Sequence, residues 1–443
     1  PLESGDALVH PAYQAGKKAI EDAASDAGYL DARFETAEIR VDLAQYRADV
    51  VLHLKTGHRF FFGPAVFRQN IVDADLVAGY LNWDRGDPFD MGKVLQFQNA
   101  LADAPYFERV EVETPRDEAE DFQIPVIATL TPARRTRYVF GAGYGTDTGF
   151  RGTLGAQFRR LNRRGHRAEA ELRYSELERG VEGRYLIPGP YPRTDVITFR
   201  GAYAEQRTDT SRSDGWLVGA GIAQSRGAWR ESFSLNYQQE KFEIGVDRGT
   251  SRLLVPEASW TRIQADDRIF ATRGWRIEFL GRVAHESAGS DATFLQLEAR
   301  GKIIHSLTPR HRLIGRVDLG HIVTQDFRRL PARIRYFAGG DRSVRGYGFH
   351  ELGRRDREGN VIGGETLAVA SIEYEFWFRP KWAAALFFDA GDAARGFPSA
   401  GKKAAGVGGR WRSPIGPVRL DVGFGFDDPK HAAVVHLTVG PDL

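Results

Sequence analysis

The chain has 443 residues, 42% of them hydrophobic and 12% aromatic, with a formal net charge of +2. No run approaches the roughly 20 apolar residues that a membrane-spanning helix needs. The balance of 61 basic and 59 acidic residues gives no reason to expect nucleic acid as a partner, and the lack of cysteine excludes disulfides. Membrane-spanning β-strands escape a hydropathy test, because lipid-facing and lumen-facing residues alternate and average out as polar. The 49 glycines and the 12% aromatic residues favour such a barrel.

Residues 1–133 mix helical and strand patterns, and the chain opens on Pro1-Leu-Glu-Ser without a signal peptide. We therefore expect the numbering to start inside a processed or trimmed chain. Two small α+β modules are predicted, over residues 1–56 (incomplete at its N-terminal side) and 57–133. Such modules can accept a client segment at an exposed strand edge, or they can serve as plain scaffold. The predicted elements are helix Gln14–Ala27, strands Arg33–Asp42 and Arg47–Lys55, strand Phe60–Gln69, helices Asp73–Trp83 and Asp90–Ala102, and strands Phe107–Glu113 and Gln123–Thr131.

From residue 137 the hydrophobic period becomes two and stays so to the C-terminal end. Phe233 and Leu235, for example, alternate with Ser234 and Asn236. Nearly every segment repeats this pattern, which favours strands with one face in lipid and the other towards a wet lumen. The sequence predicts an all-β transmembrane barrel over residues 137–443, with about 16 antiparallel strands, an even number as closed single-chain barrels have.

The longest connection between predicted strands, residues 323–364, contains the run Phe337-Ala-Gly-Gly-Asp-Arg-Ser-Val-Arg-Gly-Tyr-Gly-Phe-His350. Loops of this length are functional or disordered, and the glycines and aromatics here favour tight turns with anchors. The motif Val344, Arg345, Gly346 and Tyr347 resembles the loop signature of the outer-membrane insertase superfamily, which includes BamA, TamA and the two-partner secretion transporters. The longer run is most similar to the TamA branch. The two N-terminal modules likewise resemble the POTRA modules of this family.

The resemblance implies that loop 323–364 folds back into the barrel and that its arginine meets acidic groups on the wall. The run Phe-Phe-Asp389-Ala-Gly resembles the family's wall motif, and the resemblance places Glu373 as a second acidic partner. An arginine fork can bind a carboxylate two-fold, and a narrow lumen partly desolvates the pair. Gly346 is expected to allow a backbone conformation closed to other residues, and Tyr347 to pack as an anchor. The alternative is a hydrated loop, with Asp389 as an ordinary lumen charge.

The first and last strands form a second candidate site, a seam with few hydrogen bonds. Glycines on the lumen face of the first strand and a Gly-Pro end on the last strand weaken pairing. By the resemblance, the seam opens and a client strand is templated on its edge. The alternative is that the glycines relieve crowding at a barrel corner. The predicted lateral gate consists of Gly141, Gly143, Gly145, Val435, Leu437 and Gly440.

Catalytic motifs are missing from the sequence. It has no Gly-x-Ser-x-Gly, no His-Glu-x-x-His and no phosphate-binding lysine loop, and its 11 histidines are scattered without metal-ligand spacing. The sequence therefore predicts no enzyme, no cofactor and no metal site.

The resemblance implies a protein of the Gram-negative outer membrane with its N-terminal modules in the periplasm. It would insert or translocate β-barrel and autotransporter proteins without ATP. Its partners would be the lipid bilayer, outer-membrane protein clients and a TamB-like inner-membrane-anchored protein. Transport of phospholipid along that partner is a further possibility that the resemblance implies. Three alternatives stay open: a two-partner-secretion-type export pore, a BamA-like general insertase, and a structural or adhesive barrel without a client.

Overall fold

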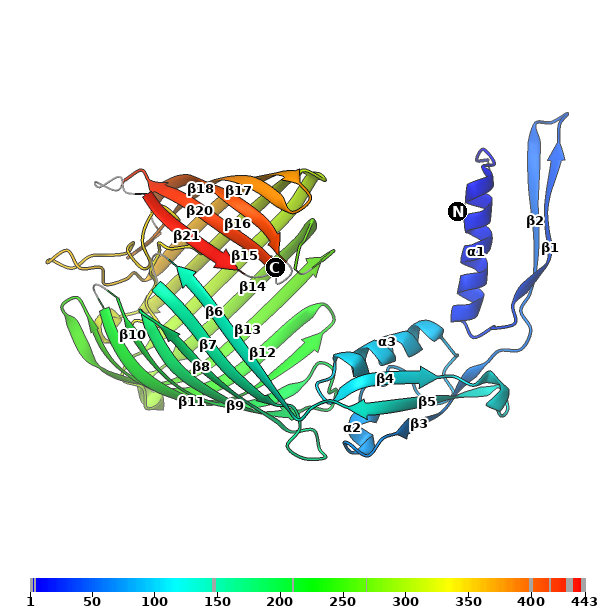
Figure 1. Ribbon diagram of the computed structural model, residues 1–443, viewed down its shortest axis with the longest axis horizontal. Coiled ribbons are helices and arrows are strands. Elements are labelled where there is room, and N and C mark those ends of the chain that lie inside the picture. The colour runs from blue at the N-terminus through cyan, green and yellow to red at the C-terminus, as the bar shows by residue number, and fades with distance from the viewer. Residues whose placement is uncertain are drawn as a thin grey trace. The chain divides into compact units, whose positions relative to one another are not determined.

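The computed structural model describes residues 3, 5–145, 149–208, 211–267, 269–397, 401–413, 416–427 and 433–439. The chain divides into two compact units, drawn in Figure 1. The first unit comprises Pro1–Arg135 with Arg159–His166 and Pro190–Arg193, and the second comprises the remaining residues. Within the described ranges, no helix is both long and apolar enough to cross a bilayer.

The first unit contains two small sheets. As far as the chain is described, one sheet has two antiparallel strands, and the other has three in the order β3-β5-β4, with β3 parallel to β5. The elements are α1 (His10–Asp26), β1 (Arg33–Asp42), β2 (Arg47–Lys55), β3 (Phe61–Arg68), α2 (Ala74–Ala78), α3 (Met91–Asp103), β4 (Phe107–Glu113), the 3-10 turn η1 (Arg116–Glu118) and β5 (Gln123–Pro132).

The three-stranded sheet and α3 enclose a compact core. Phe62 stacks on Trp83 at 4.4 Å between ring centroids, and Leu101 is fully buried. Helix α2 ends at Ala78, five residues before the predicted end at Trp83. The chain leaves helical geometry there, and Trp83 packs into the core of the three-stranded sheet. Helix α1, by contrast, buries little: of its described residues Tyr13 alone is buried, and Ile20 is 40% exposed. The two-stranded sheet β1–β2 therefore has little core of its own.

The second unit is a single antiparallel sheet curved into a barrel. Among the described residues it has sixteen strands in chain order, β6 to β21, the predicted number (Figure 1). The strands are β6 (Thr136–Gly145), β7 (Gly149–Phe158), β8 (Arg167–Ser175), β9 (Glu178–Pro188), β10 (Val196–Arg207), β11 (Ser211–Arg226), β12 (Trp229–Ile244), β13 (Asp247–Ala265), β14 (Arg273–Ala284), β15 (Phe294–Thr308), β16 (His311–Thr324), β17 (Thr366–Arg379), β18 (Trp382–Ala394), β19 (Lys402–Ser413), β20 (Gly416–Gly425) and β21 (Ala433–Val439), with 3-10 turns η2 (Glu286–Ala288) and η3 (Phe327–Arg329).

Side chains of the barrel are distributed in the opposite way to those of a soluble protein. Leu297 and Leu386 on the outer face are 53% and 58% exposed, whereas the charged side chains of Glu375 and Asp389 are buried inside. Charged residues are almost never fully buried unless they are paired. Apolar side chains outside and paired charges inside are the arrangement of a barrel in lipid, so the predicted fold class is confirmed.

The inward-facing residues become apolar at the end of the barrel where β12 joins β13. Along β12 the inward set changes from Asn236 and Glu240 to Phe242 and Ile244. This apolar collar packs against the first part of the β16–β17 connection, in particular Phe327 and other buried residues of that segment. The long connection is therefore folded inside this end of the barrel.

Candidate functional site: a loop docked on the inner barrel wall

The tip of the long loop is a compact turn closed by main-chain bonds. Ala338 and Leu352 exchange main-chain hydrogen bonds at 2.9 and 3.0 Å, and the N–H of Gly340 donates to the Tyr347 carbonyl at 3.0 Å. Gly339 and Gly340 have φ of +95° and +99°, so these two positions need glycine. The turn directs Arg345 at the inner faces of β17 to β20.

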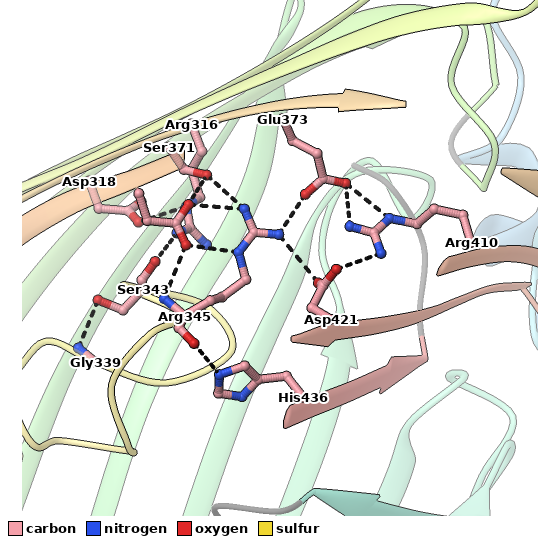
Figure 2. Close-up of polar contacts among 11 residues, drawn as sticks. Arg316, Asp318, Gly339, Ser343, Arg345, Ser371, Glu373, Arg410, Asp421 and His436 are labelled. Carbon is pink, nitrogen blue, oxygen red and sulfur yellow. Dashed lines mark hydrogen bonds and ion pairs between the residues drawn. The ribbon is translucent and has the colours of Figure 1, made fainter. Parts of the chain in front are cut away.

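Arg345 is bound by carboxylates of three different strands (Figure 2). Its Nε and Nη2 donate to the two oxygens of Asp389 on β18, at 2.8 and 2.9 Å, and its backbone N–H donates to the same carboxylate at 3.0 Å. Its Nη1 donates to Glu373 on β17 at 2.6 Å and to Asp421 on β20 at 3.3 Å. The structure thus brings Arg345 together with both predicted acidic residues, and adds Asp421.

The remaining N–H of the guanidinium donates to Ser371 Oγ at 3.2 Å, and that hydroxyl donates to Asp389 at 2.6 Å. All five donors of the fork therefore have acceptors. The guanidinium also lies over the Phe387 ring at 3.6 Å, which adds a cation–π contact. Burial alone would lower the pKa of Arg345, but the hydrogen bond with Asp389 and the surrounding carboxylates raise it above its ordinary value, so the side chain stays charged.

A second arginine, which sequence reasoning missed, completes the cluster. Arg410 on β19 donates to Glu373 at 2.6 Å and to Asp421 at 2.7 Å, and lies 3.3 Å from Glu375. Glu373 and Asp421 each use one oxygen for Arg345 and the other for Arg410, so two cations and two carboxylates alternate around a square (Figure 2). One signal was available, because alternation places Arg410 and Asp421 on the lumen-facing positions of their strands.

The role predicted for Gly346 is wrong. Its φ is not in the left-handed region, so the residue does not adopt a conformation closed to other residues. A Cβ at this position would instead lie 2.5 Å from the backbone N of Gly425 and 2.6 Å from the Ala404 Cβ. Glycine is required because the loop backbone lies directly on the wall formed by β19 and β20.

The two apolar residues of the motif fix the loop from either side of Arg345. Val344 is fully buried in a small cluster with Ala338, Leu352 and Val369. Tyr347 is 4% exposed, and its hydroxyl accepts from the Asp427 backbone N–H at 3.1 Å, at the end of β20. Tyr347 thus packs at the position expected of an anchor.

The two ends of the sheet, β6 and β21, lie next to each other (Figure 1). Over the residues that are described, no ladder pairing joins them. The predicted gate residues fall on different faces: Gly141 lies on the lumen side of β6, opposite Thr153, whereas Val435 and Leu437 alternate with the inward His436 and so face outward. Gly143 and Gly145 belong to the same strand as Gly141. Gly440 lies outside the described residues.

A further buried arginine, also missed from the sequence, attaches the loop to a different part of the wall. Arg335 has a fully buried side chain that donates to Asp247 at the start of β13, at 3.0 Å. It also donates to the Leu330 and Ile362 carbonyls at 2.9 and 3.0 Å, and lies over the Phe327 ring. The loop is therefore held at the apolar collar as well as at the charge square.

Replacing Arg335 with methionine is expected to loosen the collar, because Asp247 and three loop carbonyls (Leu330, Ile362 and Arg328) would lose their donor. Amide exchange in residues 327–336 should become roughly tenfold faster, which corresponds to about 1.4 kcal/mol. Hydrogen–deuterium exchange with mass spectrometry measures this. Arg329→Met, at a side chain that is 62% exposed, is the matched control. Equal exchange in the two variants would contradict an anchoring role for Arg335.

The fold and site define a class of protein: a membrane β-barrel whose lumen holds a loop of the same chain, fixed by buried charges. The sequence matches the Omp85 superfamily domain over residues 147–440, more than half of its length. The chain belongs to the Omp85 superfamily.

Individual relatives agree with this family. The outer membrane protein assembly factor BamA of Nitratidesulfovibrio vulgaris is 24% identical over 94% of this chain. BamA from Haemophilus ducreyi lacking POTRA domains 1–3 has a TM-score of 0.75 and 16% identity, covering 99% of this chain and 95% of that one. CdiB from Acinetobacter baumannii has a TM-score of 0.58 and 13% identity, covering 99% and 87%.

The match with the Nitratidesulfovibrio protein covers 55% of that protein, so the chain spans about half the length of this curated relative. The likeness to the solved structures, at 16% and 13% identity, concerns the fold. These relatives are BamA and CdiB proteins, so the TamA branch stays a prediction.

Proposed function

We propose that the chain is an outer-membrane assembly factor that inserts or translocates β-barrel and autotransporter proteins without ATP, cofactor or covalent catalysis. A client strand pairs with the free edge of β6 or β21, and the docked loop keeps the rest of the barrel rigid during this exchange. The small sheets of residues 1–133 act as periplasmic POTRA modules that receive clients, together with a TamB-like partner if the chain is of the TamA branch.

The observation that carries this proposal is the unpaired junction of β6 and β21 within the described residues. Free strand edges are costly in a bilayer, because no water is present to satisfy their N–H and C=O groups. An incoming strand that pairs with such an edge is therefore stabilised by main-chain hydrogen bonds, whatever its sequence. The other fifteen junctions of the described sheet are closed by continuous ladders and offer no such template.

A disulfide across the junction tests the proposal. The natural chain has no cysteine, so an introduced pair carries the only two thiols. Ala142→Cys on β6 combined with Leu437→Cys or Val435→Cys on β21 places both thiols on the outer face. We expect oxidation to reduce assembly of a client barrel in proteoliposomes to background and dithiothreitol to restore it.

The matched control joins β20 to β21, using Leu420→Cys with Leu437→Cys, which are direct partners in that ladder. This disulfide restrains the same strand but leaves the β6–β21 junction free, so assembly should continue. Full assembly by the oxidised β6–β21 pair would remove the junction from the mechanism.

An export pore of the CdiB type is the second candidate, favoured by a cavity of about 750 Å³ beside the loop in the barrel interior. A pore passes its substrate through the lumen rather than through the wall. The β6–β21 disulfide would then leave export intact, whereas it stops wall-based insertion. The one experiment therefore separates the two candidates.

A further inference from the structure

The last strand of the barrel contacts the loop motif directly. His436 of β21 is 2% exposed, and its Nε2 donates to the Arg345 backbone carbonyl at 2.8 Å (Figure 2). Arg345 is thus bound through its side chain by β17, β18 and β20, and through its backbone by β21. The loop motif reaches the strand at the open junction.

Glycines on β20 allow this approach. A Cβ on Gly423 would collide with the Arg345 carbonyl, and one on Gly425 would lie 2.9 Å from the Gly346 carbonyl and 2.8 Å from the Tyr347 ring. The loop backbone at Arg345–Tyr347 therefore lies directly on the inner face of β20, close to β21. Any side chain at these two wall positions would lift the loop away from His436.

Strand β21 depends on this contact more than an interior strand would. In the described residues it forms a ladder with β20 along one edge, while its other edge faces β6 without a ladder. A strand bonded on one side frays more easily than one bonded on both sides. A buried hydrogen bond from its middle residue to the docked loop adds a restraint from a third direction.

We propose that His436 is a latch through which the docked loop holds β21 in place against β20, so that the loop sets how readily this strand and its free edge can move to receive a client strand. This inference rests on the proposed function, because it concerns control of the same junction. His436 is a positioning residue: it acts through the loop and touches no client. Undocking of the loop removes the carbonyl acceptor and releases β21 from inside the barrel.

The chemistry of the bond selects the test variants. A carbonyl oxygen can only accept, so Nε2 carries the proton, and both the neutral Nε2–H tautomer and the imidazolium satisfy this. The glutamine amide of His436→Gln supplies an N–H at a similar reach, whereas His436→Leu fills similar space without a donor. Gly346→Ala pushes the loop off the wall and leaves the histidine unchanged. Thr438→Ala, two residues further on the same strand face, is the matched control.

The experiment is hydrogen–deuterium exchange of the full chain in lipid nanodiscs, read at residues 433–439, after heat-modified gel migration has shown that each barrel is folded. For His436→Leu and Gly346→Ala we expect exchange roughly fivefold faster than in the unaltered chain, the ratio that one net hydrogen bond produces. His436→Gln and Thr438→Ala should exchange at the unaltered rate.

Two results would overturn the latch: unaltered exchange in His436→Leu, or exchange in His436→Gln as fast as in His436→Leu. Neither result touches the proposed function, which depends on whether the β6–β21 disulfide stops assembly. Conversely, His436→Leu could speed exchange as expected while the oxidised β6–β21 disulfide variant still assembles clients. That pair of results would reject the proposed function and leave the latch standing.

Discussion

Replacement of Arg345 by methionine lowers the free energy of unfolding by about 3–5 kcal/mol, the cost of removing one partner from a buried ion pair. Asp389 loses two side-chain donors, and Glu373 and Asp421 lose one each, while all three carboxylates stay on the buried inner wall. The backbone donor of Arg345 survives the substitution, but it is lost when the loop undocks. Urea unfolding in lipid vesicles, followed by tryptophan fluorescence, measures the change. Client assembly should fall in parallel.

Two further variants show whether the effect belongs to the fork. Arg345→Lys keeps the charge but cannot bind a carboxylate with two parallel bonds, so its stability should lie between those of the unaltered chain and Arg345→Met. Arg342→Met removes an exposed arginine three residues earlier in the same loop and should unfold like the unaltered chain. The role assigned to the buried fork is untenable if Arg345→Met and Arg342→Met unfold alike.

The barrel could be predicted because its signal is repeated. Each strand carries the same alternation, so an error in one segment does not alter the pattern of the others. The contact between Arg345 and Asp389 could be predicted for a different reason: the resemblance to a family identifies both the loop motif and the wall motif and implies that the two meet.

The other members of the charge cluster, Arg410 and Asp421, could not be predicted in the same way, because alternation gives the face of each residue but not its distance from residues on other strands. Alternation assigns Arg410 and Asp421 to the lumen face, but not the height at which each meets Glu373, because that depends on the register of three ladders. Gly346 shows a related limit. A glycine in a loop sequence indicates either positive φ or close approach, and only the position of the facing wall distinguishes them.

Arg410→Met is expected to destabilise the barrel by a similar amount, about 3–5 kcal/mol, while the loop stays docked. Arg410 binds Glu373 and Asp421 and lies beside Glu375, all of them buried wall residues. Arg345 keeps its two-fold bond to Asp389 in this variant. Urea unfolding should therefore match that of Arg345→Met, whereas amide exchange in residues 338–352 should stay close to that of the unaltered chain.

Arg412→Met, two residues along β19, is the matched control. Its guanidinium lies over the Trp377 ring at 4.1 Å, a contact worth about 0.5–2 kcal/mol, so its loss should be smaller. If Arg410→Met releases the loop as fully as Arg345→Met does, the two arginines do not have the separate roles that their contacts indicate.

The double variant tests the square itself. In each single variant, the remaining arginine still neutralises Glu373 and Asp421, because each carboxylate bridges both cations. In Arg345→Met with Arg410→Met, neither carboxylate keeps a cation of the square, so the combined loss should exceed the sum of the single losses by at least about 1 kcal/mol. Additive losses, measured by the same urea unfolding, would mean that Arg345 and Arg410 stabilise the wall independently and that the shared carboxylates do not couple the loop to β19.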